Sequence, residues 1–81
     1  MAADIEIANI DKNSRETLRV TLGTFKDYRL CHLRVWARGD DAPIPTKSGF
    51  GLQANLIRPL RDALERAEHE ARVLGWLDGG G

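Results

Sequence analysis

Hydrophobic and polar residues alternate through much of the first half of the chain. A period of two is typical of strands that bury one face. One strand is predicted over residues 17–22, with Leu18, Val20 and Leu22 on its apolar side. A second follows over residues 30–37, with Cys31, Leu33, Val35 and Ala37 on one face and Leu30, His32, Arg34 and Trp36 on the other. We expect residues 23–28 to join them as a hairpin loop longer than the two-residue minimum.

Weaker patterns flank this pair. Residues 4–10 alternate through Ile5 and Ile7, which predicts a short edge strand or an ordered arm. Residues 44–52 read as a last strand, which the nearby prolines Pro43 and Pro45 confine to a sheet edge or an irregular course. Gly49 and Gly51 within it indicate a bulge or a close backbone approach.

A helix is predicted to begin near residues 54–56, with Asn55 as its N-cap and Pro59 in its first turn. Its apolar positions repeat at helical spacing and form one narrow seam: Leu60, Leu64, Ala67, Ala71 and Leu74. We expect this seam to lie on the sheet, and the alternative is a contact between the helices of a homodimer that uses Leu60, Leu64, Ala67 and Ala71. Gly75 fits a left-handed C-cap with Trp76 packing back on Ala71, and Asp62 with Arg66 and Glu68 with Arg72 are i, i+4 ion pairs.

At 81 residues the chain is one small domain, in which we distinguish an arm or edge strand (1–11), the domain proper (12–77) and a flexible glycine tail (78–81). A chain of this size has a marginal core, which a homodimer would enlarge. Twelve basic and twelve acidic residues cancel overall, yet residues 12–47 hold eight basic and four acidic residues. The strand region is therefore basic, which favours an anionic partner there.

Catalytic chemistry finds no support in the sequence. It contains no recognisable nucleophile motif, no glycine-rich phosphate loop and no pair of histidines at ligand spacing. Its one cysteine, Cys31, excludes an internal disulfide framework and is predicted to be a buried apolar residue. We therefore predict a non-enzyme without metal or cofactor. With no membrane span and no signal peptide, we expect it to be cytoplasmic.

The outward face of the second strand is unusual, because Arg34 and Trp36 are residue types that bind phosphates and stack on bases. Trp36 has an alternative role under a partner chain or the N-terminal arm. Phe25 is either core at the sheet end or exposed beside Lys26. Basic residues nearby are candidates to follow a phosphate backbone: Lys12, Arg15, Arg19 and Lys47.

Four segments in this order resemble the positive cofactor 4 family of transcriptional coactivators, particularly its short bacterial and phage members. They are residues 12–20 (KNSRETLRV), Phe25-Lys26, residues 33–36 (LRVW) and residues 45–52 (PTKSGFGL). The resemblance implies a curved four-stranded antiparallel sheet with one C-terminal helix, forming a homodimer that binds single-stranded DNA and acts on transcription. It also implies nucleic-acid contacts by Phe25, Lys26, Arg34, Trp36 and Lys47, to which the basic segment adds Arg15 and Arg19.

Two departures from that family weaken the expected site. Asp27 stands where a glycine is common, and Ser48 stands where a second basic residue is common. The serine-rich regulatory tail of the eukaryotic proteins is also absent. We therefore expect modest affinity for single strands with little sequence preference. Two alternatives remain open at this stage, a protein-interaction module of the same fold and an RNA-binding variant.

Overall fold

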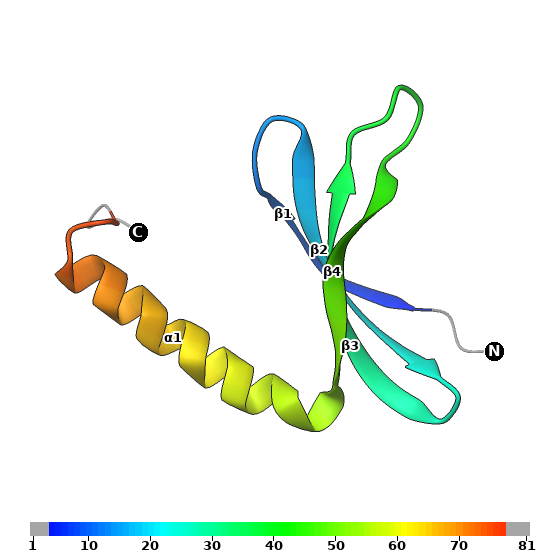
Figure 1. Ribbon diagram of the computed structural model, residues 1–81. Coiled ribbons are helices and arrows are strands. Elements are labelled where there is room, and N and C mark those ends of the chain that lie inside the picture. Colours follow the sequence, from blue (N-terminus) through cyan, green and yellow to red (C-terminus); the bar gives the residue numbers. More distant parts are fainter. Residues whose placement is uncertain (1–3, 78–81) are drawn as a thin grey trace.

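The computed structural model describes residues 4–77 as a four-stranded antiparallel sheet followed by a helix (Figure 1). The strands β1 (Ile5–Asp11), β2 (Glu16–Phe25), β3 (Tyr28–Ala37) and β4 (Ile44–Gln53) are neighbours in chain order. A short 3-10 turn, η1 (Ala54–Leu56), leads into α1 (Ile57–Val73). The predicted α+β architecture is confirmed, and residues 5–11 form an edge strand of the sheet. The tail predicted for residues 78–81 lies outside the described residues.

The turn between β2 and β3 has two residues, so the prediction of a longer loop is wrong. Phe25 and Tyr28 are directly paired across the turn. Lys26 and Asp27 between them have positive φ angles of 47° and 70°, the left-handed conformation at both central positions that a tight type I′ turn requires. The sequence carries no Asn-Gly or Asp-Gly signal here, which is why the turn escaped detection. Both strands are consequently longer than predicted.

The register between strands gives the sheet two chemically different faces. Residues directly opposite each other point to the same side, so Leu18 with Val35 and Leu22 with Cys31 share the apolar face. The opposite side, here called the polar face, receives Glu6, Thr17, Arg19, Thr21, Phe25, Tyr28, His32, Arg34 and Trp36. Cys31 is 7% exposed and is the one buried hydrophobic residue within residues 4–77, which agrees with its predicted role.

Helix α1 does not cover its own sheet. Figure 1 shows it leaving the end of β4 through η1 and running away from the strands. The prediction that the apolar seam lies on the sheet is therefore wrong for the single chain, in which Leu64 and Leu74 are about 60% exposed. The radius of gyration is 15.0 Å, whereas a compact chain of this length has about 12 Å. The apolar face and the seam are both left without a covering element within the described chain.

Local signals at the ends of α1 had mixed success. Leu56, not Asn55, occupies the N-cap, and no side chain caps this end. The predicted left-handed C-cap is confirmed, whereas Trp76 is linked to Ala71 through the backbone alone: Gly75 has a φ of 79°, its N–H donates to the Arg72 carbonyl, and the Trp76 N–H donates to the Ala71 carbonyl. This pair of bonds is a Schellman motif. The Trp76 indole itself is 75% exposed.

One of the two predicted ion pairs on α1 is present. Arg72 lies 3.4 Å from Glu68, in the favourable i, i+4 order. Asp62 instead pairs with its neighbour Arg61 at 2.9 Å. Both pairs are exposed, so each stabilises the helix by well under about 1 kcal/mol.

Candidate nucleic-acid interface

Two arginines and a tryptophan meet at the centre of the polar face. Arg19 on β2 and Arg34 on β3 are directly opposite each other. The guanidinium carbon of Arg19 lies 3.9 Å from the centroid of the Trp36 ring. Like charges at facing positions destabilise a sheet, so this pair is tolerated only because each guanidinium has other partners.

Those partners differ for the two arginines. Arg34 donates a hydrogen bond of 2.9 Å from Nη1 to the Thr46 carbonyl oxygen on β4. Its side chain therefore helps to hold the edge strand as well as contributing charge. Arg19 stacks on Trp36, and its Nε lies 3.2 Å from a carboxylate oxygen of Glu6 on β1. That Nε is buried and its geometry toward Glu6 is not that of a hydrogen bond, so the donor remains unsatisfied within the described chain.

A hollow of about 230 Å³ opens beside this cluster, lined by Asp4, Arg19, Thr21, His32, Arg34 and Trp36. Its wall offers two fixed cations and an aromatic surface, the groups that receive a phosphate and a base. One acidic side chain, Asp4, shares the rim. Sequence reasoning missed Asp4 because it treated the N-terminal segment as separate from the basic strands.

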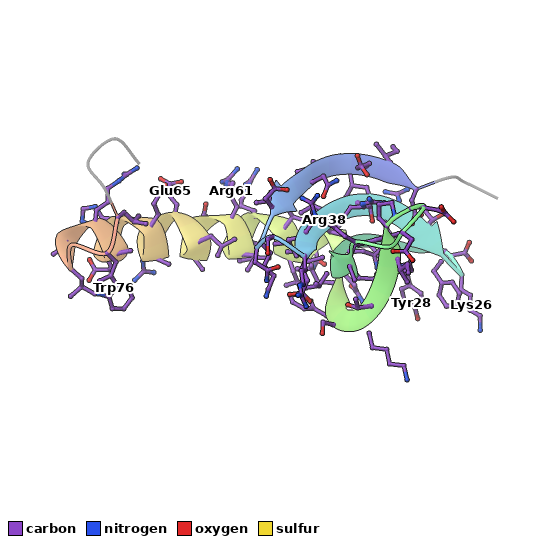
Figure 2. All side chains as sticks on the ribbon, turned by 90° about the horizontal axis from the view of Figure 1, so that it is seen from above. Lys26, Tyr28, Arg38, Arg61, Glu65 and Trp76 are labelled. Carbon is purple, nitrogen blue, oxygen red and sulfur yellow. The ribbon has the colours of Figure 1, made fainter. Side chains whose placement is uncertain are left out.

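The tight turn carries a second aromatic group to the end of the same face. Phe25 is 61% exposed and Tyr28 is 57% exposed. The Lys26 ammonium lies 5.4 Å from the centroid of the Phe25 ring, within the range of a cation–π contact. The exposed alternative for Phe25 is thus the one that the single chain adopts. Figure 2 shows Lys26 and Tyr28 on the side of the sheet away from the helix, with Trp76 at the far end of α1.

Sequence reasoning did not select Tyr28, although the signal was present. The alternation that places His32, Arg34 and Trp36 together reaches Tyr28 when it is continued two steps toward the N-terminus. Assigning residues 23–28 to a loop cut the pattern short. The polar face therefore has aromatic side chains at its turn end as well as beside the two central arginines.

Lys47 lies in an irregular part of β4. Three residues of β4, Thr46, Lys47 and Ser48, stand opposite Val35 alone, between the pairs Arg34 with Gly49 and Trp36 with Pro45. The Thr46 hydroxyl fixes this bulge by donating to the Val35 carbonyl at 2.7 Å and accepting from the Ser48 N–H at 3.1 Å. The predicted bulge is confirmed, and Lys47 is exposed upon it.

The backbone at position 49 can be occupied only by glycine without strain. Its φ is 144°, and a Cβ there would clash with the Leu33 carbonyl oxygen and come within 2.7 Å of the Arg34 Cα. The backbone of β4 therefore approaches β3 closely beside Arg34. This approach also sets the position of the Thr46 carbonyl that Arg34 contacts.

Arg15 lies apart from the other predicted residues, in the connection between β1 and β2. Its carbonyl accepts a hydrogen bond of 2.9 Å from the Arg38 N–H, which brings a second arginine to this end of the sheet. The seven predicted nucleic-acid residues therefore occupy four places: the central cluster (Arg19, Arg34, Trp36), the tight turn (Phe25, Lys26), the bulge (Lys47) and the far connection (Arg15).

Side chains of the same connection also contact Glu16, the first residue of β2. The Glu16 carboxylate accepts hydrogen bonds from Asn13 at 3.0 Å and Lys12 at 3.2 Å. The Asn13 bond first, then the Lys12 bond and charge, hold the pKa of Glu16 below its ordinary value of 4.5. Lys12 is thereby engaged within the chain, so we do not count it among the free cations.

A metal site and a membrane-spanning helix are two further possibilities for the described chain. Residues 4–77 contain no group of three metal-ligating side chains, and none of the described helices is long and apolar enough to cross a membrane. His32 lies on β3 and His69 on α1. The four predicted dimer-contact residues, Leu60, Leu64, Ala67 and Ala71, all lie along α1.

Comparison with solved structures identifies the fold. The chain matches BPSL1147, a PC4 homolog from Burkholderia pseudomallei K96243, with a TM-score of 0.77 and 20% identity over 86% of this chain and 96% of that one. It also matches the bacteriophage T5 homolog of the eukaryotic transcription coactivator PC4, with a TM-score of 0.68 and 26% identity over 91% of this chain and 86% of that one. No family model and no curated protein matches the sequence.

Proposed function

Because this chain is PC4-like, with the fold of the bacterial and phage PC4 homologs, we propose that it binds single-stranded or melted DNA with little sequence preference. Bases stack on the aromatic side chains of the polar face, and arginine and lysine side chains neutralise the phosphates. Each stacked base contributes about 1–3 kcal/mol. The residues are those predicted from the sequence, Phe25, Lys26, Arg34, Trp36, Lys47, Arg15 and Arg19, with Tyr28 added.

The facing pair Arg19 and Arg34 is the observation that carries this proposal. Two cations directly opposite on central strands cost stability in the free protein. A bound phosphate would reverse that cost, because it accepts charge-assisted hydrogen bonds from both. Trp36 beside them supplies the stacking surface, so phosphate and base contacts fit in one place.

We further propose that the working unit is a homodimer. The accessible surface of the chain is 6868 Å², whereas a compact monomer of 9.0 kDa exposes about 4,900 Å². The excess of about 2,000 Å² per chain is of the size that obligate homodimers bury. The apolar face of the sheet and the seam of α1, including Leu60, Leu64, Ala67 and Ala71, are the surfaces that a second copy would cover.

The biological process follows from the ligand. A protein that holds single strands acts wherever duplex DNA opens, and transcription is the process indicated by PC4-type coactivators. The phage T5 homolog is described as implicated in recombination-dependent DNA replication, a second process that exposes single strands. We propose a regulatory role in transcription or such a process, at the cytoplasmic nucleoid if the cell is bacterial.

Two other functions make different predictions. A protein-interaction module of the same fold is favoured by the overall charge of zero, and it predicts no affinity for nucleic acid. An RNA-binding variant predicts a preference for RNA over DNA of the same sequence, because a 2′-hydroxyl reader would add contacts.

Fluorescence anisotropy tests the three readings together. Labelled single strands of about 20 nucleotides, long enough for both halves of a dimer, are compared as DNA, as RNA and as the matching DNA duplex. We expect the DNA strand to bind more tightly than the duplex, with affinity falling as salt rises. Absence of binding at low salt would contradict the proposal and favour the protein-interaction module.

A further inference from the structure

Glu6 contacts Arg19, one of the two central cations of the proposed site. Its carboxylate oxygen lies 3.2 Å from the Nε of Arg19, while the Arg19 side chain is 19% exposed and that of Glu6 is 54% exposed. Glu6 is thus the more exposed partner of the pair. A phosphate entering the hollow beside Trp36 has to approach the same guanidinium.

A bulge in β1 places Glu6, instead of Ile7, on the polar face. Glu6 pairs with Thr21 and Ala8 with Val20, so Ile7 is the extra residue of a bulge. Bulges re-aim side chains at the edges of sheets. Glu6 is thereby diagonal to Arg19, within reach of a long side chain.

The fit between Glu6 and Arg19 is incomplete. The Nε of Arg19 is buried, and it has no aligned acceptor within the described chain although the carboxylate is near. A buried donor without an acceptor destabilises the folded chain, because it has lost its hydrogen bonds to water. Unlike the Glu6 carboxylate, a phosphate is not tethered to β1. Once Glu6 has moved away, a phosphate oxygen can align with the Nε–H and accept its hydrogen bond.

A second acidic residue, Asp4, lies close to the same cations. The Asp4 carboxylate lies against Gly23 on β2, in the space that a side chain at Gly23 would fill, and Asp4 lines the hollow with Arg19, Arg34 and Trp36. Asp4, just before β1, and Glu6 within it thus bring two negative charges to a face whose proposed ligand is negative. Neither charge is needed for stacking on Trp36.

We propose that Glu6 is an internal competitor of the nucleic-acid phosphate for Arg19, and that it sets the affinity of the polar face. This inference rests on the proposed function. In the free protein Glu6 neutralises Arg19 and limits the repulsion between Arg19 and Arg34. When a single strand binds, a phosphate replaces the carboxylate at the guanidinium, and Glu6 turns to solvent. Its position on an edge strand means that anything that displaces β1 would raise affinity.

The test compares Glu6→Gln with the wild-type chain and with Glu65→Gln, which removes the same charge from an exposed position on α1. Anisotropy with a labelled single DNA strand is measured between about 50 and 200 mM salt, where phosphate contacts dominate the salt dependence. We expect Glu6→Gln to bind about two- to fivefold more tightly, the worth of an exposed ion pair. The slope of log affinity against log salt should steepen by about 0.7, which is one phosphate.

A double-mutant cycle then assigns the gain to Arg19. In an Arg19→Gln background, Glu6→Gln should bring no further gain. Equal gains from Glu6→Gln and Glu65→Gln would show a general charge effect and overturn the inference. Weaker binding by Glu6→Gln would also overturn it, since Glu6 would then be positioning Arg19. Circular dichroism and sedimentation of each variant confirm that fold and assembly are unchanged.

The two hypotheses fail in distinguishable ways. If the wild-type chain binds and Glu6→Gln binds no better, the proposed function stands and this inference is wrong. If neither protein binds at low salt, both are wrong, because removal of the competitor should expose binding that the wild-type chain conceals.

Discussion

The guanidinium of Arg19 lies over the indole of Trp36, 3.9 Å from the ring centroid, and joins β2 to β3 across the polar face. Such a stack at a partly exposed site is worth about 0.5–2 kcal/mol. It also means that one face of the indole is occupied in the free protein. If the proposed function is right, a base would stack on the open part of the ring or on the guanidinium plane, which is itself a stacking surface.

Replacing Trp36 by Ala should weaken binding of a single DNA strand by about 5- to 150-fold, the range for one lost stacking contact. Trp36→Phe keeps a smaller ring and should lose less. Anisotropy titration gives the affinities, and thermal melting reports the fold. If Trp36→Ala unfolds the protein or dissociates the proposed dimer, the indole is structural and its assignment to the ligand is wrong.

Asp27 should be replaceable by Gly with a gain of stability. Its φ of 70° is unfavourable for most side chains, and removing the Cβ should stabilise the tight turn by about 0.5–1 kcal/mol. Urea denaturation measures the change. Asp27→Asn, which tolerates the same conformation without the charge, is the control for binding: if repulsion of phosphates matters, both variants bind more tightly, whereas only the glycine variant gains clearly in stability.

Gly49→Ala should cost about 2–4 kcal/mol, because the new methyl group meets the backbone of Leu33 and Arg34 at an unfavourable φ. Gly75→Ala is the matched control. Gly75 also has a positive φ, of 79°, but nothing lies within 4 Å of an added Cβ, so only the conformational cost of about 1 kcal/mol applies. Equal losses in denaturant midpoints would mean that the close approach of β4 to β3 is not required.

Unfolding of the chain should depend on protein concentration, since folding and association are coupled in an obligate dimer. Leu64→Glu puts a charge into the proposed interface and should lower stability by about 3 kcal/mol or more per dimer. Glu65→Gln, one residue away, should have little effect. Sedimentation equilibrium and melts at several concentrations test this; a stable monomer with a concentration-independent melt would exclude the dimer.

The β1–β2 connection should weaken in acid. The folded state lowers the pKa of Glu16 below its ordinary value of 4.5, chiefly through Asn13 and then Lys12. A depressed pKa means that the ionised form stabilises the fold above the unfolded pKa, and that this contribution disappears as pH falls through the folded pKa. The free energy of unfolding should therefore fall less between neutral and acid pH in Glu16→Gln than in the wild-type chain. An unchanged pH profile in that variant would show that the bonds of Glu16 add nothing to stability. The effect is small, because the connection is exposed.

Periodicity predicted the elements because their causes are local. Alternation in β2 and β3 reflects one apolar face, and the Gly75 C-cap reflects a backbone angle that glycine adopts readily. The confirmed bulge at Gly49 has the same origin. Two features were predicted wrongly because no characteristic residue type marks them. The tight turn is formed by Lys26 and Asp27, and α1 starts at Leu56 without a side-chain cap.

By itself the sequence determined which residues share a face: the period of two places Arg34 with Trp36, and Leu33 with Val35, whatever else the chain does. Only the tertiary structure decided what these residues meet. The register of β2 on β3 sets Arg19 opposite Arg34, and the bulge in β1 brings Glu6 to Arg19. The tertiary structure also directs α1 away from its own sheet, and the apolar face of the sheet and the seam of α1 are therefore uncovered. Strand register depends on turn length and on bulges, and the course of α1 depends on contacts outside the helix, so neither can be read from the hydrophobic period of a single segment.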